Sequence, residues 1–285
     1  MSTYSQKVLT PKRLREGFTL IEISMVILII ALVAGGLFVG KDLIESGKVK
    51  STISTKGEFE TATSIFLLKY ESLPGDASTP KIPNATARTR SDGQGDNDGM
   101  IEQSTGMGAN VANQCGENLI YWADLFNADL INTAGNTAVN GGGGACGYST
   151  VTDPNQIATY LPRSAWGGST FWFLFRPDAN TRPRVHFYGL TEIKELRSSG
   201  NIFYYSADQY DAKYPVPVSA AQTIDLKLDD GLPGTGKVQT TKYSMYGNAI
   251  SSLASQQDTT TCRAASGNTY RSNGTGCSML FELNF

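Results

Sequence analysis

A continuous apolar segment near the N-terminus restricts what this chain can fold into more than any other feature. It covers residues 18–40 and carries a single charge, at Glu22. As a helix, about 23 residues would extend roughly 34 Å, which is enough to cross the hydrocarbon core of a bilayer. Because residues 1–17 hold four basic side chains and one acid, we expect that end to stay cytoplasmic and the remainder to lie across the membrane.

The order of the basic and apolar segments differs from that of an ordinary secretory signal. An ordinary signal has a shorter apolar core, which precedes a small-residue cleavage site. Here the expected cut, after Gly17 in the sequence Glu16-Gly17-Phe18, comes before the apolar segment. Cleavage there would remove the basic leader and leave the hydrophobic segment on the mature chain.

Glu22 is unusual because an ionisable group within a membrane segment is costly and is a functional hypothesis by default. One interpretation is that it lies near the helix N-terminus, where the helix dipole favours an anion. The other is that it neutralises a new α-amino group on Phe18 of a neighbouring chain, if the helices are staggered by about one turn. Taken alone, the residues leave both interpretations open.

The residues from Gly17 to Glu22, followed by the apolar segment, closely resemble the prepilin cleavage and methylation motif of type IV pilins and type II secretion pseudopilins. The resemblance implies cleavage after Gly17 by a membrane aspartyl prepilin peptidase, and N-methylation of Phe18. It also implies that Glu22 helps to recruit a subunit to a growing fibre. Many pilins carry a proline midway along this segment, whereas this chain has Gly35-Gly36 and Gly40. Each glycine weakens a helix by about 1 kcal/mol.

Helical periodicity continues beyond the apolar segment, over residues 43–70. The apolar side chains form an imperfect stripe, which consists of Ile44, Val49, Ile53, Phe59, Ala62, Ile65, Phe66 and Tyr70. Such a stripe needs a partner, and a globular head is the simplest one. The pattern ends at Leu73-Pro74-Gly75-Asp76. We therefore expect a leader (1–17), a transmembrane and polymerisation segment (18–40), an amphipathic stalk helix (41–72) and a loop-rich globular head (73–285).

The head is predicted to give the chain an α+β, pilin-like fold, in which the long N-terminal helix packs on an antiparallel sheet with long loops. Residues 117–131 have the apolar spacing of a short helix. Aromatic and β-branched residues, separated by Pro and Gly, mark the strand candidates, which are residues 170–175, 184–190, 201–206, 223–228, 237–241 and 278–285. His186 falls inside one candidate strand. No nucleophile and acid are paired with it in sequence, which favours a structural or surface role over catalysis.

An Asp/Gly-rich loop at residues 92–102 resembles a calcium-binding loop. Its candidate ligands are Asp92, Asp96, Asp98 and Glu102. The fit to the EF-hand pattern is poor, and such loops are also common as solvated turns. A second carboxylate cation site at Asp229-Asp230 is the alternative to a tight turn there. No cofactor is required, and calcium is the metal that these loops suggest.

Four widely spaced cysteines follow the export segment, a pattern that favours two disulfides in an oxidising compartment. None lies in a C-x-x-C pair, so zinc-site spacing is absent. Three connectivities are allowed, and we favour Cys115–Cys146 with Cys262–Cys277 because each pair closes a local loop. The segment that Cys262–Cys277 would close also resembles the disulfide-closed C-terminal loop of many pilins. Buried free thiols are the alternative.

These features predict a structural subunit of a type IV pilus or a type II secretion pseudopilus, and not an enzyme. The precursor would span the bacterial inner membrane once with a periplasmic head, then enter an extracytoplasmic fibre. The expected partners are other pilin or pseudopilin subunits, a prepilin peptidase, an inner-membrane assembly platform and membrane lipid. The net charge of −2 gives no sign of a nucleic-acid surface. The alternative is a membrane-tethered extracytoplasmic domain for adhesion or DNA capture.

Overall fold

The structure is a computed structural model, and it describes residues 17–77, 95, 97–101, 117–133, 151–175, 185–194, 214–241, 261–264 and 267–283. The chain divides into two compact units, Met1–Glu45 and Ser46–Phe285. One helix, α1 (Leu20–Tyr70), contributes residues to both units. The prediction of a single helix that continues from the apolar segment into the amphipathic segment is therefore confirmed.

In the first unit, the N-terminal part of α1 has exposed apolar side chains. Leu20 is 88% exposed and Leu32 is 76% exposed. Among the described residues, α1 is the one helix that is long and apolar enough to cross a membrane. It continues without a break through Gly35-Gly36, so these glycines do not interrupt the helix in the single chain.

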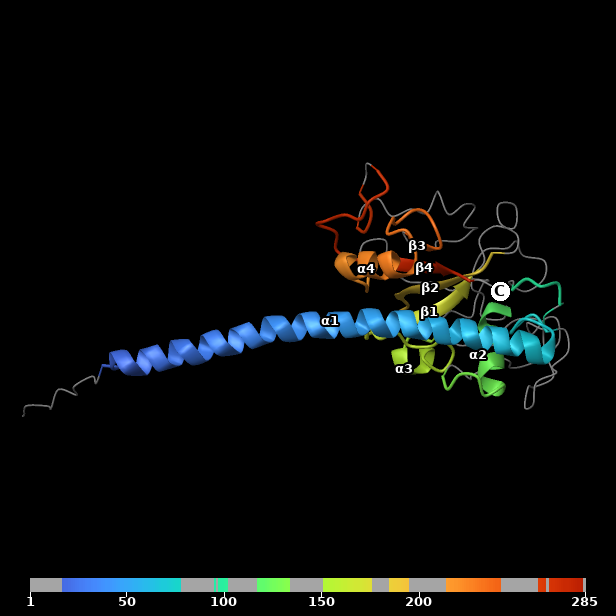
Figure 1. The fold of residues 1–285 in the computed structure, drawn as a ribbon. Coiled ribbons are helices and arrows are strands. Elements are labelled where there is room, and N and C mark those ends of the chain that lie inside the picture. Colours follow the sequence, from blue (N-terminus) through green and yellow to red (C-terminus); the bar gives the residue numbers. More distant parts are fainter. Residues whose placement is uncertain are drawn as a thin grey trace, which may run out of the picture. The chain divides into compact units, whose positions relative to one another are not determined.

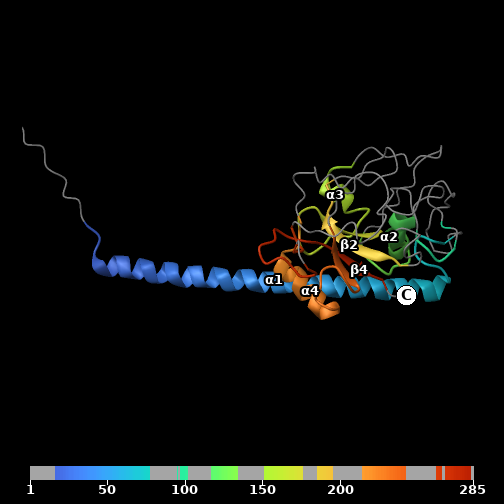
Figure 2. The same cartoon turned by 90° about the horizontal axis from the view of Figure 1, so that it is seen from above.

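The second unit contains a four-stranded antiparallel sheet with the strand order β1-β2-β4-β3. The strands are β1 (Thr170–Phe175), β2 (Phe187–Glu192), β3 (Val238–Thr241) and β4 (Ser278–Glu282). The described residues of this unit also form the helices α2 (Glu117–Asn127), α3 (Pro154–Ile157) and α4 (Val218–Leu228). Figures 1 and 2 both show the C-terminal part of α1 beside the strands. The α+β, pilin-like architecture expected from the sequence fits this arrangement.

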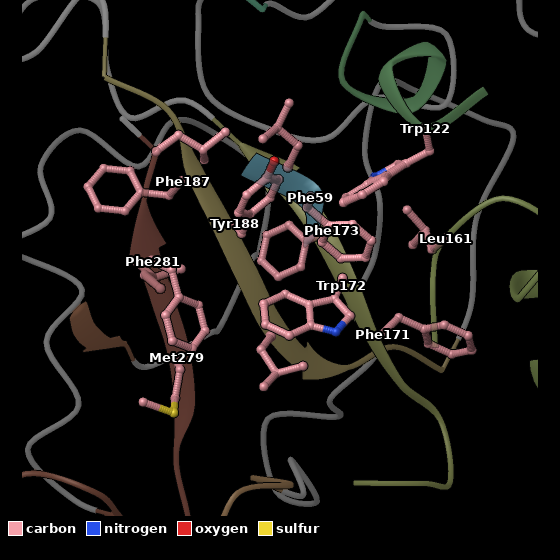
Figure 3. Packing of buried hydrophobic residues seen from close by; sticks show 14 of the residues in the cluster. Phe59, Trp122, Leu161, Phe171, Trp172, Phe173, Phe187, Tyr188, Met279 and Phe281 are labelled. Atoms are coloured by element: carbon pink, nitrogen blue, oxygen red, sulfur yellow. The ribbon is translucent and has the colours of Figure 1, made fainter. Parts of the chain in front are cut away.

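Phe59 of α1 is a central contact between the helix and the sheet. Its ring centroid lies 4.8 Å from that of Trp122 in α2, 5.8 Å from Trp172 in β1 and 5.7 Å from Tyr188 in β2. Figure 3 shows these rings clustered with further aromatic residues of the sheet. Edge-to-face aromatic pairs contribute about 0.5–1.5 kcal/mol each beyond the burial of their area. One side chain of α1 thus contacts three other elements.

A group of three buried hydroxyls joins the same elements through hydrogen bonds. The Thr63 hydroxyl donates to the Phe59 carbonyl at 2.8 Å, and its oxygen lies within hydrogen-bonding distance of the hydroxyls of Tyr121 and Tyr188. The two phenol oxygens lie 2.5 Å apart. Because each hydroxyl has one proton and Thr63 has used its own, the two phenols can make two of these three contacts as hydrogen bonds. Burial raises the pKa of both tyrosines, so each keeps its proton and can donate. Buried polar groups that are fully paired in this way help to specify one arrangement of the core.

The turn after α1 is fixed by a close approach to α2. Gly75 adopts a φ of +85°, and a Cβ at this position would lie 2.2 Å from the carbonyl oxygen of Glu117. Its backbone N–H donates to the Asp124 carboxylate at 2.8 Å. Only glycine combines this conformation with such close contact. The helix end predicted at residues 73–76 is confirmed, since α1 stops at Tyr70.

Both outer edges of the sheet are partly paired with nearby segments of the same chain. At the β1 edge, the Trp172 N–H donates to the Pro162 carbonyl at 2.8 Å. At the β3 edge, the Thr240 N–H donates to the Pro233 carbonyl, also at 2.8 Å. Occupied edge groups hinder the addition of a strand from another chain.

The predicted strand at 223–228 is wrong, because these residues lie in the helix α4. The alternation of Ile224 and Leu226 resembles the period of a strand. In the structure, however, Ile224 is buried and Leu226 is 61% exposed, so the two side chains do not share a face. The buried residues Ala220 and Ile224 have helical spacing instead.

The other boundaries agree with the predictions to different degrees. β1 has the expected bounds, whereas β3, β4 and α2 are each shorter than predicted. The strand expected at 184–190 is β2, which begins at Phe187, so His186 precedes the strand instead of lying within it. The candidate strand at 201–206 lies outside the described residues.

The amphipathic stripe of α1 is mostly buried, with two exceptions. Its buried members are Val49, Phe59, Ala62, Phe66 and Tyr70, and Ile53 is partly buried. Ile44 and Ile65 are 63% and 44% exposed, contrary to the prediction. Two polar residues, Thr52 and Thr63, are buried instead. Their hydroxyls bond to the carbonyl four residues earlier, which lowers the cost of burying them.

A substitution at Gly189 tests the packing of the sheet. It lies opposite Phe173 in the β1–β2 register, and an added Cβ would meet the Phe173 ring at 1.9 Å. We expect Gly189→Ala to lower the free energy of unfolding by roughly 1–3 kcal/mol, because the buried ring has to move. Urea unfolding of the chain in detergent measures this change. Gly57→Ala is the control, since space around that helical position is open; equal effects of both substitutions would contradict the packing.

Candidate processing and assembly site

The expected scissile bond, between Gly17 and Phe18, lies in a non-helical segment. Residues 17–19 have no regular secondary structure and α1 begins at Leu20. The side chain of Phe18 is 84% exposed. The expected scissile bond therefore lies in exposed backbone outside the helix.

Thr19 and Glu22 close the first turn of α1 through a reciprocal pair of contacts. The Glu22 Oε2 atom accepts from the Thr19 backbone N–H at 2.8 Å and from the Thr19 hydroxyl at 2.7 Å. The Glu22 backbone N–H donates to the Thr19 hydroxyl oxygen at 3.3 Å. This is a capping box, which satisfies donors that a helix N-terminus otherwise leaves unpaired. In the single chain, Glu22 thus caps its own helix, as the first of the two interpretations requires.

Ser24 is the second polar side chain near the start of the apolar helix. Its hydroxyl donates to the Leu20 carbonyl at 2.7 Å. In a bilayer an unpaired polar group costs several kcal/mol, so this bond makes a serine compatible with a membrane segment. The polar groups of Thr19, Glu22 and Ser24 are all engaged within the first turns of the same helix.

The C-terminal disulfide joins Cys262 and Cys277, whose Cα atoms lie 5.0 Å apart. Both residues are completely buried. This pair is the one that we favoured from sequence. The other predicted pair, Cys115–Cys146, lies outside the described residues.

The segment closed by this disulfide is attached to α4 and to the turn that follows it. The Tyr270 hydroxyl donates to Asp225 Oδ2 at 2.8 Å. The Asn268 side-chain amide donates to the Thr235 hydroxyl at 3.0 Å. The disulfide therefore closes the C-terminal segment, and the two hydrogen bonds connect it with elements distant in sequence.

Three carboxylates gather where α4 ends, and this group includes one residue that the sequence did not single out. Oxygen atoms of Asp225, Asp229 and Asp230 lie within 4.8 Å of one another. Burial, together with the two neighbouring carboxylates and opposed by hydrogen bonds from Tyr270 and Gly231, raises the pKa of Asp225 to about 6. Three carboxylates can ligate a hard cation such as calcium. Asp230 also accepts from the Leu232 N–H, as expected of a tight turn, and Asp229 accepts from the N–H of Val238 at the start of β3.

Of the four predicted calcium ligands in the Asp/Gly loop, only Asp98 is described. Its Oδ1 atom accepts from the Met100 N–H at 2.8 Å, which organises the local turn. The adjacent Gly99 N–H donates to the buried carboxylate of Asp76 at 3.0 Å. The remaining candidate ligands, Asp92, Asp96 and Glu102, lie outside the described residues. The calcium site in this loop stays a prediction.

His186 lies in the core and connects two segments. It is 1% exposed, and its Nε2 atom accepts from the backbone N–H of Ile101 at 2.8 Å. This places the histidine in a buried, structural position. The carboxylates of Asp76 and Asp124 likewise accept hydrogen bonds from backbone N–H groups, of Gly99 and Gly75. The predicted turn at 73–76 is the sequence signal that could have identified them.

Comparison with known proteins bears on the N-terminal segment. Residues 12–38 match the family model of the prokaryotic N-terminal methylation motif. This motif is the prepilin-type cleavage and methylation signature of type IV pilins and pseudopilins. No curated protein and no solved structure matches the chain. The matched residues include the expected cut and the capping box, so the chain carries a prepilin-type signature at the site described above.

The raised pKa of Asp225 predicts how stability depends on pH. The folded chain holds this proton to about pH 6, above the ordinary value of 3.8, so this carboxyl lowers stability as pH rises through that window. We expect Asp225→Asn to be more stable than the wild type by roughly 1–3 kcal/mol at pH 7, and not at pH 4. Urea unfolding at both pH values measures the difference.

The control for this comparison is Asp42→Asn, which removes one negative charge from an exposed position of α1. The change in the free energy of unfolding caused by Asp42→Asn should not show the difference between pH 4 and pH 7 that we expect for Asp225→Asn. If Asp225→Asn is no more stable than the wild type at pH 7, the carboxyl is not destabilising and the account of this cluster is wrong.

Proposed function

We propose that this chain is a structural subunit of a type IV pilus or a type II secretion pseudopilus. It is made as a prepilin, cleaved after Gly17 and assembled through its N-terminal helix. The observation that carries the proposal is the prepilin-type signature at residues 12–38. It coincides with the start of α1, a helix with exposed apolar side chains.

The chemistry of the site suits this sequence of events. Cleavage of the bond after Gly17 creates a new α-amino group on Phe18, which is positively charged and stays so after a single N-methylation. A charged group within a bilayer is costly unless it has a partner. In the proposed fibre, Glu22 of one subunit pairs with this amino group of the next, and the apolar faces of the helices pack together.

Partners and location follow from the same segment. The basic leader stays in the cytoplasm, so the head lies in the periplasm and the precursor spans the inner membrane once. A prepilin peptidase, an inner-membrane assembly platform, membrane lipid and other pilin-like subunits are the proposed partners. The occupied edges of the sheet favour assembly through α1 over strand exchange.

The size of the head and its irregular loops favour a minor or specialised subunit over a major one. The chain has 285 residues, well above a minimal pilin. This proposal concerns the role within a fibre and leaves the head without a catalytic function.

Processing and assembly can be separated by two substitutions. We expect the mature protein to begin at Phe18 and to carry one methyl group on its nitrogen. Gly17→Val should block cleavage, because it replaces the glycine of the Gly17-Phe18 junction by a branched side chain. Glu22→Ala should be cleaved yet enter fibres poorly, because the amino group of Phe18 loses its partner. Intact-mass spectrometry and sedimentation of sheared fibres measure the two steps.

Gly47→Val is the matched control for the glycine substitution, since Gly47 lies on α1 with open space around it. It should be cleaved like the wild type. Mature protein that still contains residues 1–17, or normal assembly of Glu22→Ala, would remove the main support for a fibre subunit.

We also propose that the Asp/Gly loop at 92–102 binds calcium, through carboxylate oxygens of the kind that this ion prefers. Chelation should then lower the melting temperature of the chain, and Asp98→Ala combined with Asp96→Ala should abolish that change. Asp225→Asn in the same assay shows whether the cluster at the end of α4 contributes instead. No change on chelation would contradict calcium binding by this loop.

A further inference from the structure

The capping box at the start of α1 uses only one of the two carboxylate oxygens of Glu22. Both bonds from Thr19, that of its N–H and that of its hydroxyl, end on Oε2. Among the described residues, Oε1 accepts no hydrogen bond, and Glu22 is exposed. The carboxylate is therefore held on one side and accessible on the other.

Holding a carboxylate before a partner arrives has a physical consequence. A free glutamate side chain samples many rotamers, and ordering it on association opposes binding. Two bonds from Thr19 restrict the Glu22 side chain already in the separate subunit. They also supply two donors to a negative charge that would otherwise be poorly solvated in a bilayer.

We infer that Thr19 is a positioning residue for assembly. It holds Glu22 by Oε2, so that Oε1 faces outward to a cationic group of a second copy of this chain. The inference rests on the proposed function, in which this cationic group is the α-amino group of Phe18 created by cleavage. The hydroxyl of Thr19 is the essential part, because it donates to Glu22 Oε2 and accepts from the Glu22 N–H.

The test uses the full-length chain, expressed in cells that contain its own peptidase and assembly machinery. Thr19→Val keeps the shape of the side chain and removes the hydroxyl, whereas Thr19→Ser keeps the hydroxyl. Glu22→Gln keeps an acceptor for the capping box and removes the charge. Leader removal is measured by intact mass, and assembly by the fraction of mature protein in sedimented fibres.

We expect Thr19→Val to be cleaved like the wild type and to assemble about fivefold less, the factor that corresponds to loss of a typical capping residue. Thr19→Ser should restore assembly. The double variant Thr19→Val/Glu22→Gln should assemble no worse than Glu22→Gln alone, because positioning matters only when the charge is present.

The outcomes separate this inference from the function on which it rests. Normal assembly of Thr19→Val, a loss confined to cleavage, or an additive effect in the double variant would each overturn the positioning role. Each would leave the fibre proposal intact as long as Glu22→Gln still assembles less than the wild type. Normal assembly of Glu22→Gln would instead contradict the proposed function itself.

Discussion

A polar group inside a bilayer needs a hydrogen-bond partner, and the first turn of α1 is built to supply one for each group at its N-terminus. Thr19 and Glu22 cap each other, and the Ser24 hydroxyl bonds to the Leu20 carbonyl. Because these hydrogen bonds form within the helix itself, a single helix can carry a carboxylate in an otherwise apolar segment. It also fixes where the helix begins, and so leaves the bond after Gly17 outside it.

The second half of the same helix differs from the first, because its apolar side chains pack against protein. Phe59 packs against three aromatic rings and Thr63 joins two buried tyrosines. These contacts tie α1 to α2 and to the sheet within the second unit. A continuous helix thus has one segment suited to a membrane and one that is part of a folded core.

The sequence predicted the parts of the fold that depend on local patterns. The apolar segment is identified by its length, the amphipathic stripe by its helical spacing and strand β1 by its short run of aromatic residues. Residues 223–228 show where local patterns fail. A short alternation there fits a strand, but the alanines before it favour a helix, and only burial distinguishes the two.

The site residues also differ in how far the sequence predicts them. Gly17 and Glu22 follow from a motif. Asp225, in contrast, joins Asp229 and Asp230 through a helical turn, and the partner of Tyr270 depends on long-range packing.

In the proposed fibre, subunits meet through their N-terminal helices, with Glu22 of one next to Phe18 of another. An electron cryomicroscopy map of intact fibres at side-chain resolution can show whether they do. We expect the Glu22 carboxylate to lie within about 4 Å of the Phe18 nitrogen of a neighbouring subunit, the distance of an ion pair. Fibres in which the helices do not touch, or in which Glu22 still bonds only to its own Thr19, would contradict it.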